Sequence, residues 1–300
     1  MDESEQLESN VFDTALCFEG GGYRASYTSG FVNVLLENHV YFDFVCGISA
    51  GASHTVDYVS RDKWRVRASF MQLTDKRPEA GGVVSMLTGH GYFNADYDYV
   101  GCTLDGVMPF DWETFSANPA RVAIQSVRAD TGESVVWGRE AMPAAIPMME
   151  HVRASSTLPG IMNPTVVDGH VMFDGGLGEG AGLPTHMAED AGFKRIVFVA
   201  TRPRGYRKKA PTPHELRVYS AITRKYPAIY ELLATRADRY NAAMEHLEKL
   251  ERDGRAWVFR PDVMPVKSTT IDKPKLEQAY EMGYEQARRD FPAMMEWLRG

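Results

Sequence analysis

The chain has 300 residues, of which 44% are hydrophobic and 24% charged, a balance typical of a globular chain with one large core. Its net charge of −7 lacks the basic excess that gives proteins their affinity for nucleic acid, so we expect no nucleic-acid partner. The three cysteines are too few for a disulfide framework and show no metal-ligand spacing. We therefore expect no metal, no cofactor and a reducing, cytoplasmic environment.

The start of the chain is acidic and polar, with neither the basic residues nor the apolar stretch of a secretion signal. No run in the sequence approaches the roughly 18 apolar residues that a membrane span needs. The sequence therefore predicts a cytoplasmic protein whose only contact with a membrane would be peripheral, at the inner membrane surface.

A strand, a helix and a second strand are predicted at the beginning of the globular part. Residues 14–19 are apolar and lead directly into the glycines at 20–22, and apolar side chains then recur at helical spacing from Tyr27 to Leu35. Residues 42–49 form a second apolar run typical of a buried strand. Short connections make this a βαβ unit, so both strands should be parallel and should end at the same, ligand-binding edge of the sheet.

Two hairpins are predicted in the middle of the chain. Alternating apolar residues at 121–127 and 134–138 flank a turn. Asp168–Gly169 separates two further apolar runs, and the second of them leads directly into Asp174. Residues 80–99 are rich in glycine, methionine and aromatic side chains without periodicity, which indicates a mobile loop or a short helix.

The last third of the chain is predicted to be mainly helical. A buried strand at 195–200 is followed by a charged region whose apolar stripe extends over residues 212–254. Residues 257–261 are suited to an edge strand, since they end in a proline that cannot sit in a central ladder. A final amphipathic helix follows, which Pro292 is expected to break or restart.

Ser49 is the first candidate for chemistry. It is the centre of a G-x-S-x-G match, Gly47-Ile48-Ser49-Ala50-Gly51, placed at the end of a predicted strand and the start of a helix. Such a turn exposes the serine hydroxyl at the sheet edge, where a helix N-terminus favours negative charge. Two interpretations stay open from the pentapeptide alone, a nucleophile and a serine that merely caps the helix.

Three consecutive glycines, Gly20, Gly21 and Gly22, end the neighbouring strand and are followed by Tyr23 and Arg24. Backbone amides of consecutive glycines can approach a developing oxyanion without side chains in between, as acyl transfer requires. A phosphate-binding loop fits less well, because Ala25 occupies the place of the third glycine in G-x-G-x-x-G. A plain tight turn is the remaining interpretation.

Asp174 is the third candidate. It begins Asp174-Gly175-Gly176 after an apolar strand, so its carboxylate could reach the same edge of the sheet. Asp168–Gly169 is the contrast, since it lies between two short apolar runs and is typical of a hairpin turn. Taken alone, Asp174 could also be a turn residue.

In order along the chain, GGGYR, GISAG, ASSTLPG (154–160) and DGG resemble the signature elements of the patatin-like phospholipase family, over roughly residues 14–201. The resemblance implies an α/β fold, a three-layer α/β/α sandwich with a mostly parallel central sheet. It also implies hydrolysis of lipid acyl esters by a serine–aspartate dyad without histidine. The implied site comprises the nucleophile, the base, the oxyanion loop and supporting residues: Ser49; Asp174; Gly20, Gly21 and Gly22; Arg24, Gly47, Gly51 and Gly175.

The same resemblance divides the chain into a patatin-like catalytic domain at residues 1–205 and a mainly helical C-terminal extension at 206–300, with one strand that could return to the sheet. The extension resembles that of a bacterial subgroup. Two departures concern loop packing and pocket shape: Ala25 stands where the family usually has glycine, and GEGAGLP (178–184) replaces the usual Asn-x-Pro. Neither removes a catalytic atom.

The expected activity is hydrolysis of a lipid or other acyl ester, of the phospholipase A or lysophospholipase kind, through an acyl-enzyme on Ser49. A Ser-His-Asp hydrolase using His186 is a rival, although only 27 positions separate Gly22 from Ser49, a shorter interval than such enzymes show. Two different classes of protein also stay open: an acyltransferase on the same scaffold and a non-catalytic lipid-binding protein.

Two further segments could contact lipid. A basic cluster could hold anionic headgroups at a membrane surface, although such a run is more often a solvated loop: Arg202, Arg204, Arg207, Lys208 and Lys209. The stretch Gly81–Gly91 could form a lid over the acyl pocket or a plain loop.

Overall fold

The computed structural model of the chain describes residues 7–75 and 79–300, so most of the polar start of the chain lies outside the described residues. Its strands are β1 (Thr14–Phe18), β2 (Phe44–Ile48), β3 (Arg121–Arg128), β4 (Ser134–Trp137), β5 (Thr165–Val167), β6 (His170–Asp174), β7 (Arg195–Val199) and β8 (Ala256–Phe259).

The helices of the described residues are α1 (Ala25–Glu37), α2 (Ala50–Val59), α3 (Lys63–Ala68), α4 (Val83–Leu87), α5 (Cys102–Leu104), α6 (Trp112–Ala117), α7 (Ala145–Ser156), α8 (Thr185–Asp190), α9 (Pro213–Ile222), α10 (Pro227–Ala234), α11 (Arg236–Arg252) and α12 (Lys273–Arg299). None of them is long and apolar enough to cross a membrane.

One mostly parallel sheet organises the described residues. Its order is β5-β6-β3-β2-β1-β7-β8, with β4 paired to β3. The ladders β3–β2, β2–β1, β1–β7 and β7–β8 are parallel, and the two predicted hairpins supply the antiparallel strands β4, β5 and β6. Asp168 forms the predicted turn between β5 and β6, with φ of 51° at Asp168 and 77° at Gly169.

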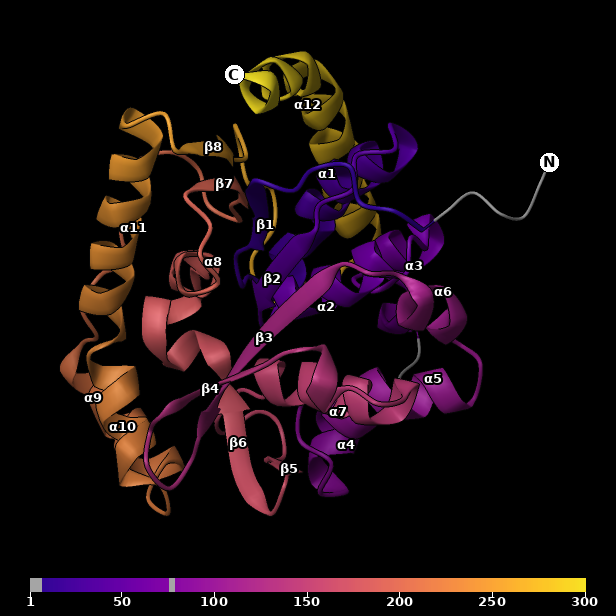
Figure 1. Cartoon of the computed structure of the whole chain (residues 1–300). Coiled ribbons are helices and arrows are strands. Elements are labelled where there is room, and N and C mark those ends of the chain that lie inside the picture. The colour runs from indigo at the N-terminus through magenta and orange to yellow at the C-terminus, as the bar shows by residue number, and fades with distance from the viewer. Residues whose placement is uncertain (1–6, 76–78) are drawn as a thin grey trace.

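Helices cover both faces of this sheet, as the alternation of side chains along each strand requires (Figure 1). In β1, Leu16 and Phe18 join the core beneath α1, α2, α7 and α12. Ala15 and Cys17 point to the other face, where α8 and α11 pack. The prediction of a three-layer α/β/α sandwich is therefore confirmed.

The residues after 205 are built into the same core instead of forming an appendage. Strand β8 pairs in parallel with β7 at the edge of the sheet, where an edge strand was predicted at residues 257–261. Helix α12 packs on α1 so closely that Gly30 and Gly283 meet the backbone of the opposite helix. The sequence boundary at residue 205 thus does not coincide with a division of the core.

Helix α12 differs from the sequence prediction in one respect. Pro292 neither breaks nor restarts it, and the helix continues from Lys273 to Arg299. The cost of one missing backbone donor is offset by packing, since Met294, just beyond the proline, is fully buried.

The segment at 80–99 contains a short helix, α4, in agreement with one of the two predicted forms. Glycines with positive φ precede and follow α4, among them Gly82 at 111° and Gly89 at 87°. The amides of Tyr92 and Phe93 donate to the carbonyl of Ile161, which ties this segment to the loop after α7.

Candidate active site

The register of the sheet brings Ser49 and Asp174 together. Strand β4 pairs with residues 124–127 of β3 and therefore occupies one edge of that strand. On the other edge β2 covers β3 up to the Ile48↔Gln125 pair, and β6 covers it from the Asp174↔Ser126 pair onward. Strands β2 and β6 thus run toward each other along β3, and the residues at their carboxyl ends face one another.

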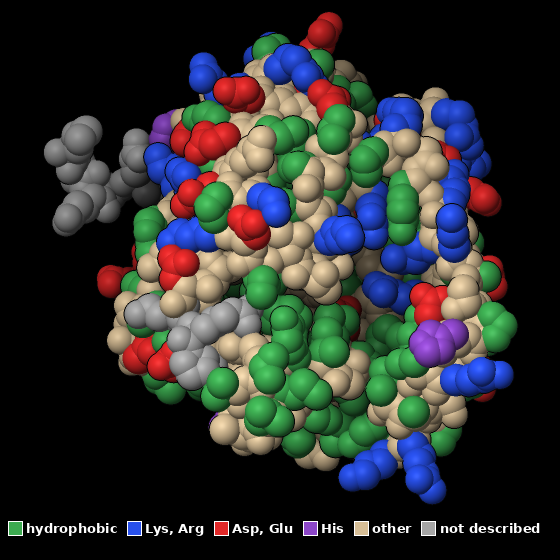
Figure 2. All heavy atoms as spheres, turned by 180° about the vertical axis from the view of Figure 1, so that it is seen from behind, with side chains coloured by type: hydrophobic (Ala, Val, Ile, Leu, Met, Phe, Trp, Pro, Cys, Tyr) green, Lys and Arg blue, Asp and Glu red, His purple; other side chains and the backbone are tan. Residues whose placement is uncertain are grey.

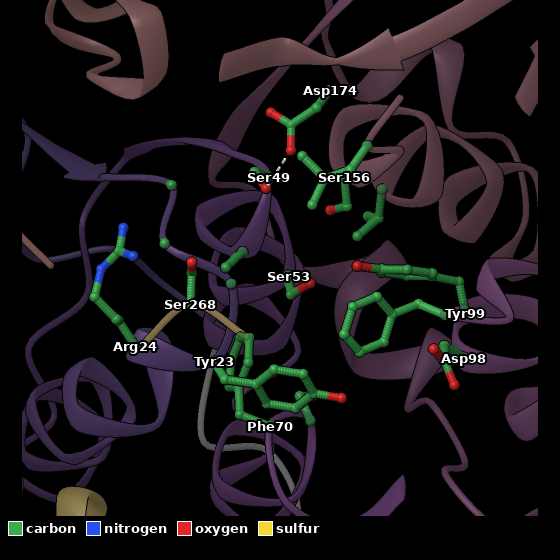
Figure 3. A pocket seen from close by; sticks show the side chains of 18 of the residues that line it. Tyr23, Arg24, Ser49, Ser53, Phe70, Asp98, Tyr99, Ser156, Asp174 and Ser268 are labelled. Carbon is green, nitrogen blue, oxygen red and sulfur yellow. Dashed lines mark hydrogen bonds between the residues drawn. The ribbon is translucent and has the colours of Figure 1, made fainter. Parts of the chain in front are cut away.

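Ser49 occupies the sharp turn between β2 and α2. Its φ of 59° and ψ of −124° are unusual for a residue with a side chain, as expected of a strained nucleophile turn. The Ser49 hydroxyl makes no helix-capping hydrogen bond and instead donates to Asp174 Oδ2 at 2.7 Å (Figure 3). The interpretation of Ser49 as a capping residue is therefore wrong.

The glycines around Ser49 allow this turn to pack tightly. A Cβ atom at Gly47 would overlap the carbonyl oxygen of Gly51, and one at Gly51 would overlap the carbonyl oxygen of Phe18. Gly175 plays the same part after Asp174, since a Cβ there would overlap the carbonyl oxygen of Gln125. The supporting positions Gly47, Gly51 and Gly175 are thus places of close backbone approach.

Ser155 is a residue that sequence reasoning did not single out. The Ser49 amide donates to Ser155 Oγ at 2.9 Å, and that hydroxyl donates to the Gln125 carbonyl at 2.6 Å. Ser155 is fully buried in α7 and so fixes the backbone of the turn to β3. The only sequence signal was its place in the ASSTLPG stretch.

Asp174 is buried, at 3% exposed, and both of its carboxylate oxygens accept hydrogen bonds. Its Oδ1 accepts from the Gly176 amide at 2.6 Å, which leaves Oδ2 for Ser49. Burial raises the pKa of Asp174, while the Arg236 guanidinium, the Ser49 hydrogen bond and the Gly176 amide oppose this effect. A raised pKa makes the carboxylate a better proton acceptor than an exposed aspartate.

The loop of three glycines at residues 20–22, called the glycine loop below, lies beside Ser49. Its three backbone amides are not equivalent. The Gly20 amide donates to the Gly182 carbonyl at 3.0 Å, so Gly20 differs from the expectation of a free oxyanion donor. A Cβ at Gly20 would lie 3.2 Å from Ser49 Cβ, which makes Gly20 a spacing residue. Among the described residues the amides of Gly21 and Gly22 have no such partner, and they remain the candidate donors.

The carbonyl that accepts the Gly20 hydrogen bond belongs to the stretch that departs from the usual Asn-x-Pro. Gly182 lies within GEGAGLP, whose backbone includes Ala181 at φ 50° and Gly182 at φ 115°. This conformation presents the Gly182 carbonyl to the glycine loop. The second departure, Ala25, is fully buried against Ala50 and Phe70.

A cavity of about 230 Å³ contains Ser49 and Asp174 and extends in two directions. Figure 3 shows Ser49 between Arg24 on one side and Tyr99 on the other. The side away from Arg24 is largely apolar, with Phe70, Leu73, Phe93, Met108, Met149 and Met162 among its lining residues. Arg65 also reaches that side, but its charge is balanced by Asp57 at 3.0 Å.

Arg24 marks the opposite, cationic side of the cavity. It is 7% exposed, and its guanidinium donates to Thr201 Oγ1 at 3.3 and 3.4 Å. Burial and the neighbouring charge of Arg202 lower the pKa of Arg24 to about 10. Arg24 therefore lines the cavity, and in the described part of the chain no carboxylate lies within ion-pair distance of it, although the charge of Glu19 acts on it.

Histidine does not contact Ser49 in the described part of the chain. His186 Nε2 lies 2.7 Å from Gln125 Oε1, and burial lowers the pKa of His186. His54 bonds to Thr28 Oγ1 at 2.8 Å in the core, where burial lowers its pKa to about 3. The geometry therefore gives a Ser-His-Asp site no support.

Residues 7–75 and 79–300 contain no group of three or more histidine, cysteine, aspartate or glutamate side chains placed to hold a metal ion. The basic cluster of the sequence is also divided in space. Arg204 and Arg207 form ion pairs with Glu251 and Glu248, both at 2.8 Å or less. Arg202 and Lys208 line the cavity instead.

The fold and site together define a class: an α/β protein with a serine at a strand-to-helix turn, bonded to a buried carboxylate beside a glycine loop. The Patatin-like phospholipase family model matches residues 16–188, more than half of the chain, and the chain belongs to this family. A second model, described as a domain of unknown function (DUF6363), matches residues 226–299.

The proteins that are similar to the chain include a curated enzyme and a protein of known structure. Lysophospholipase nte1 of Aspergillus terreus is 24% identical over 293 residues, an alignment that covers 90% of this chain and 17% of the relative. The chain thus spans less than a fifth of that protein. The crystal structure of VipD from Legionella pneumophila aligns with a TM-score of 0.47 and 12% identity, covering 96% of this chain and 67% of that one.

Proposed function

We propose that the protein is a lipid acyl hydrolase in which Ser49 is the nucleophile and Asp174 the general base. The observation that carries the proposal is the 2.7 Å hydrogen bond from Ser49 Oγ to Asp174 Oδ2 inside a cavity that many apolar side chains line. Membership of the patatin-like phospholipase family and the similarity to a lysophospholipase support a lipid ester as the substrate.

In the proposed reaction, Asp174 accepts the Ser49 proton as Ser49 Oγ attacks the acyl carbonyl carbon. The amides of Gly21 and Gly22 donate to the carbonyl oxygen as it becomes negative. The alcohol leaves with the proton from Asp174, and a fatty-acyl ester on Ser49 remains. Water, deprotonated by Asp174, then attacks this ester and releases the fatty acid, restoring both side chains.

Substitution of Ser49 tests the nucleophile. Ser49→Ala should lower turnover of a short-chain nitrophenyl ester to background, because no other hydroxyl is bonded to Asp174 among the described residues. Ser53→Ala is the matched control, since Ser53 lies one helical turn later and lines the same cavity. A Ser49→Ala protein that keeps wild-type turnover would refute the proposed nucleophile.

Two further measurements separate hydrolysis from mere binding and from acyl transfer. Labelling of Ser49 by a fluorophosphonate probe, lost in Ser49→Ala, is expected of an enzyme and not of a binding protein. Product analysis with added glycerol distinguishes hydrolysis from acyl transfer: free fatty acid should dominate. Predominant formation of a new ester would identify an acyltransferase instead.

We further propose that α4 contacts the lipid surface. Four of its five side chains are exposed hydrophobics: Val83 at 66%, Val84 at 56%, Met86 at 60% and Leu87 at 82%. The segment that carries α4 also supplies Phe93 to the cavity wall, so an acyl chain leaving a bilayer at α4 would enter the apolar side. Figure 2 shows hydrophobic side chains gathered beside a hollow bordered by Lys and Arg.

Vesicle co-sedimentation tests this contact. Val84→Glu with Leu87→Glu should reduce binding to phosphatidylcholine vesicles and hydrolysis of vesicle lipid, while turnover of a soluble ester falls much less. Val218→Glu is the control, because Val218 is 42% exposed on α9. Equal vesicle binding by wild type and the α4 variant would reject the contact.

A further inference from the structure

Four cationic side chains meet at the side of the cavity opposite the apolar one. Arg24, Arg202, Lys208 and Arg236 all line the cavity that contains Ser49 and Asp174. They come from separate segments: Arg24 follows the glycine loop, Arg202 and Lys208 belong to the loop after β7, and Arg236 is the first residue of α11. We call these four residues the cation cluster.

Neutral groups hold each member of the cation cluster in place. Arg202 lies over the Tyr206 ring at 4.1 Å, and Lys208 lies over the Tyr240 ring at 4.6 Å. Arg236 Nε donates to the Gly176 carbonyl at 2.6 Å. In the part of the chain that the structure describes, no member of the cluster has an ion-pair partner, and the buried Nε of Arg202 has no hydrogen-bond partner.

The positive charge of the cation cluster exceeds the negative charge around it. Two nearby carboxylates, those of Glu19 and Asp174, interact electrostatically with members of the cluster. Glu19 accepts hydrogen bonds from the Thr201 amide and the Tyr240 hydroxyl, and Asp174 from Ser49 and Gly176. Burial, together with repulsion from neighbouring cations, lowers the pKa of Lys208 to about 7. The unbalanced charge favours an anion in the cavity.

We infer that the cation cluster binds the phosphate group of an anionic lipid ester, so that the phosphate lies on one side of Ser49 and the acyl chain on the other. This inference rests on the proposed function. Guanidinium groups match phosphate oxygens with paired hydrogen bonds, and a phosphate ester carries the one or two negative charges that would balance the cluster.

The rest of a lipid headgroup also has space beyond the cation cluster. A second cavity, of about 720 Å³, shares Arg24 and Arg202 with the first. It reaches the surface at Val263, which is 62% exposed. A headgroup attached to the phosphate can therefore extend to solvent while the ester stays at Ser49.

The inference gives the C-terminal region a role in substrate recognition. Arg236 lies in the part matched as a domain of unknown function, and so do Ser268 and Thr269, which line both cavities. Lys208 is tied to α11 by paired hydrogen bonds between its backbone and the Asn241 side chain, at 2.8 and 3.0 Å. Residues 226–299 thus complete the phosphate subsite.

Binding of lipid analogues that have no ester tests the subsite without catalysis. Isothermal titration calorimetry would compare dodecyl phosphate, the neutral dodecyl maltoside and inorganic phosphate. We expect dodecyl phosphate to bind most tightly, and Lys208→Met and Arg202→Gln each to weaken it by about tenfold or more. Arg204→Gln is the control, because Arg204 is in the same loop but pairs with Glu251 outside the cavity.

The titrations can contradict the phosphate subsite in three ways. Unchanged affinity for dodecyl phosphate in both folded cluster variants would overturn the inference, as would tighter binding of the maltoside. Inorganic phosphate binding as tightly as dodecyl phosphate would overturn the assignment to a lipid and indicate a free-phosphate site.

Hydrolysis separates this inference from the proposed function. The ratio of kcat/KM for a lysophosphatidic acid to that for a monoacylglycerol of the same chain should fall about tenfold in Lys208→Met or Arg202→Gln. If wild type hydrolyses both esters and the ratio stays constant, the subsite fails and the function stands. If wild type binds dodecyl phosphate but hydrolyses neither ester, the proposed function fails and the subsite stands.

Discussion

At the scale of residues, the pKa of Asp174 sets the pH range in which the proposed reaction can proceed. A buried carboxylate resists ionisation, and the neighbouring cations partly offset that resistance. Asp174 must be ionised to accept the Ser49 proton. The same cations that we infer to bind phosphate therefore also keep the proposed base in its active form.

This balance predicts the pH dependence of the activity. Because the pKa of Asp174 is raised, kcat/KM for a neutral soluble ester should fall as the pH falls through that value, at a higher pH than the usual aspartate value of about 4. Lys208 lowers the pKa of Asp174, so Lys208→Met should move the midpoint to higher pH. The measurement is the pH profile of kcat/KM, with Arg204→Gln as control; a midpoint moved downward by Lys208→Met would contradict this account.

At the scale of elements, the contact between α1 and α12 shows why the last helix is needed. Two glycines, Gly30 and Gly283, let the helices approach until backbone meets backbone. Side-chain hydrogen bonds fasten the pair, from Tyr27 to Gln286 at 2.5 Å and from Asn33 to Tyr280 at 2.9 Å. Helix α1 follows the glycine loop directly, so a contact that holds α1 in place also holds the end of that loop.

A methyl group at Gly283 should therefore destabilise the fold. Its Cβ would overlap the Tyr27 carbonyl oxygen, and overpacking of this kind costs about 1–3 kcal/mol or more. This exceeds the gain of up to about 1 kcal/mol from replacing glycine by alanine within a helix. Thermal unfolding of Gly283→Ala should show a lowered Tm, whereas Glu285→Ala on the exposed side of α12 should not. A Gly283→Ala protein as stable as wild type would contradict this prediction, because the two helices would then accommodate the methyl group without loss of stability.

At the scale of the whole molecule, we expect the chain after residue 205 to unfold as one cooperative unit with the part before it. It supplies β8 to the sheet, α11 to one face and α12 to the other. Removing it would expose the edge of β7 and the apolar sides of α1 and β1, which a small domain cannot tolerate.

Truncation tests this unity. A fragment of residues 1–205 should aggregate or unfold without cooperativity, because both apolar faces of the sheet would lose cover. Circular dichroism during heating, compared with the full chain, gives the answer. A monomeric fragment with a sharp unfolding transition would establish residues 1–205 as an independent domain.

Local sequence patterns predicted most elements of the fold and the residues that meet at the site. Apolar runs predicted strands buried on both faces, and turn residues placed the hairpin at Asp168–Gly169. Pro292 was misjudged, since local propensity is overridden when a helix packs along its whole length. Ser155 carries no signal of its own, because a buried serine acquires a role only from the backbone groups that surround it.

The sequence by itself determined which short segments could form a sharp serine turn, a glycine loop and a carboxylate after a strand, because these depend on the conformational preferences of neighbouring residues. Only the tertiary structure decided that β2 and β6 meet end to end along β3, that the Gly20 amide bonds to the Gly182 carbonyl, and that Lys208 and Arg236 line the cavity that contains Ser49. These features arise from strand register and packing between segments far apart in the chain, which no local pattern specifies.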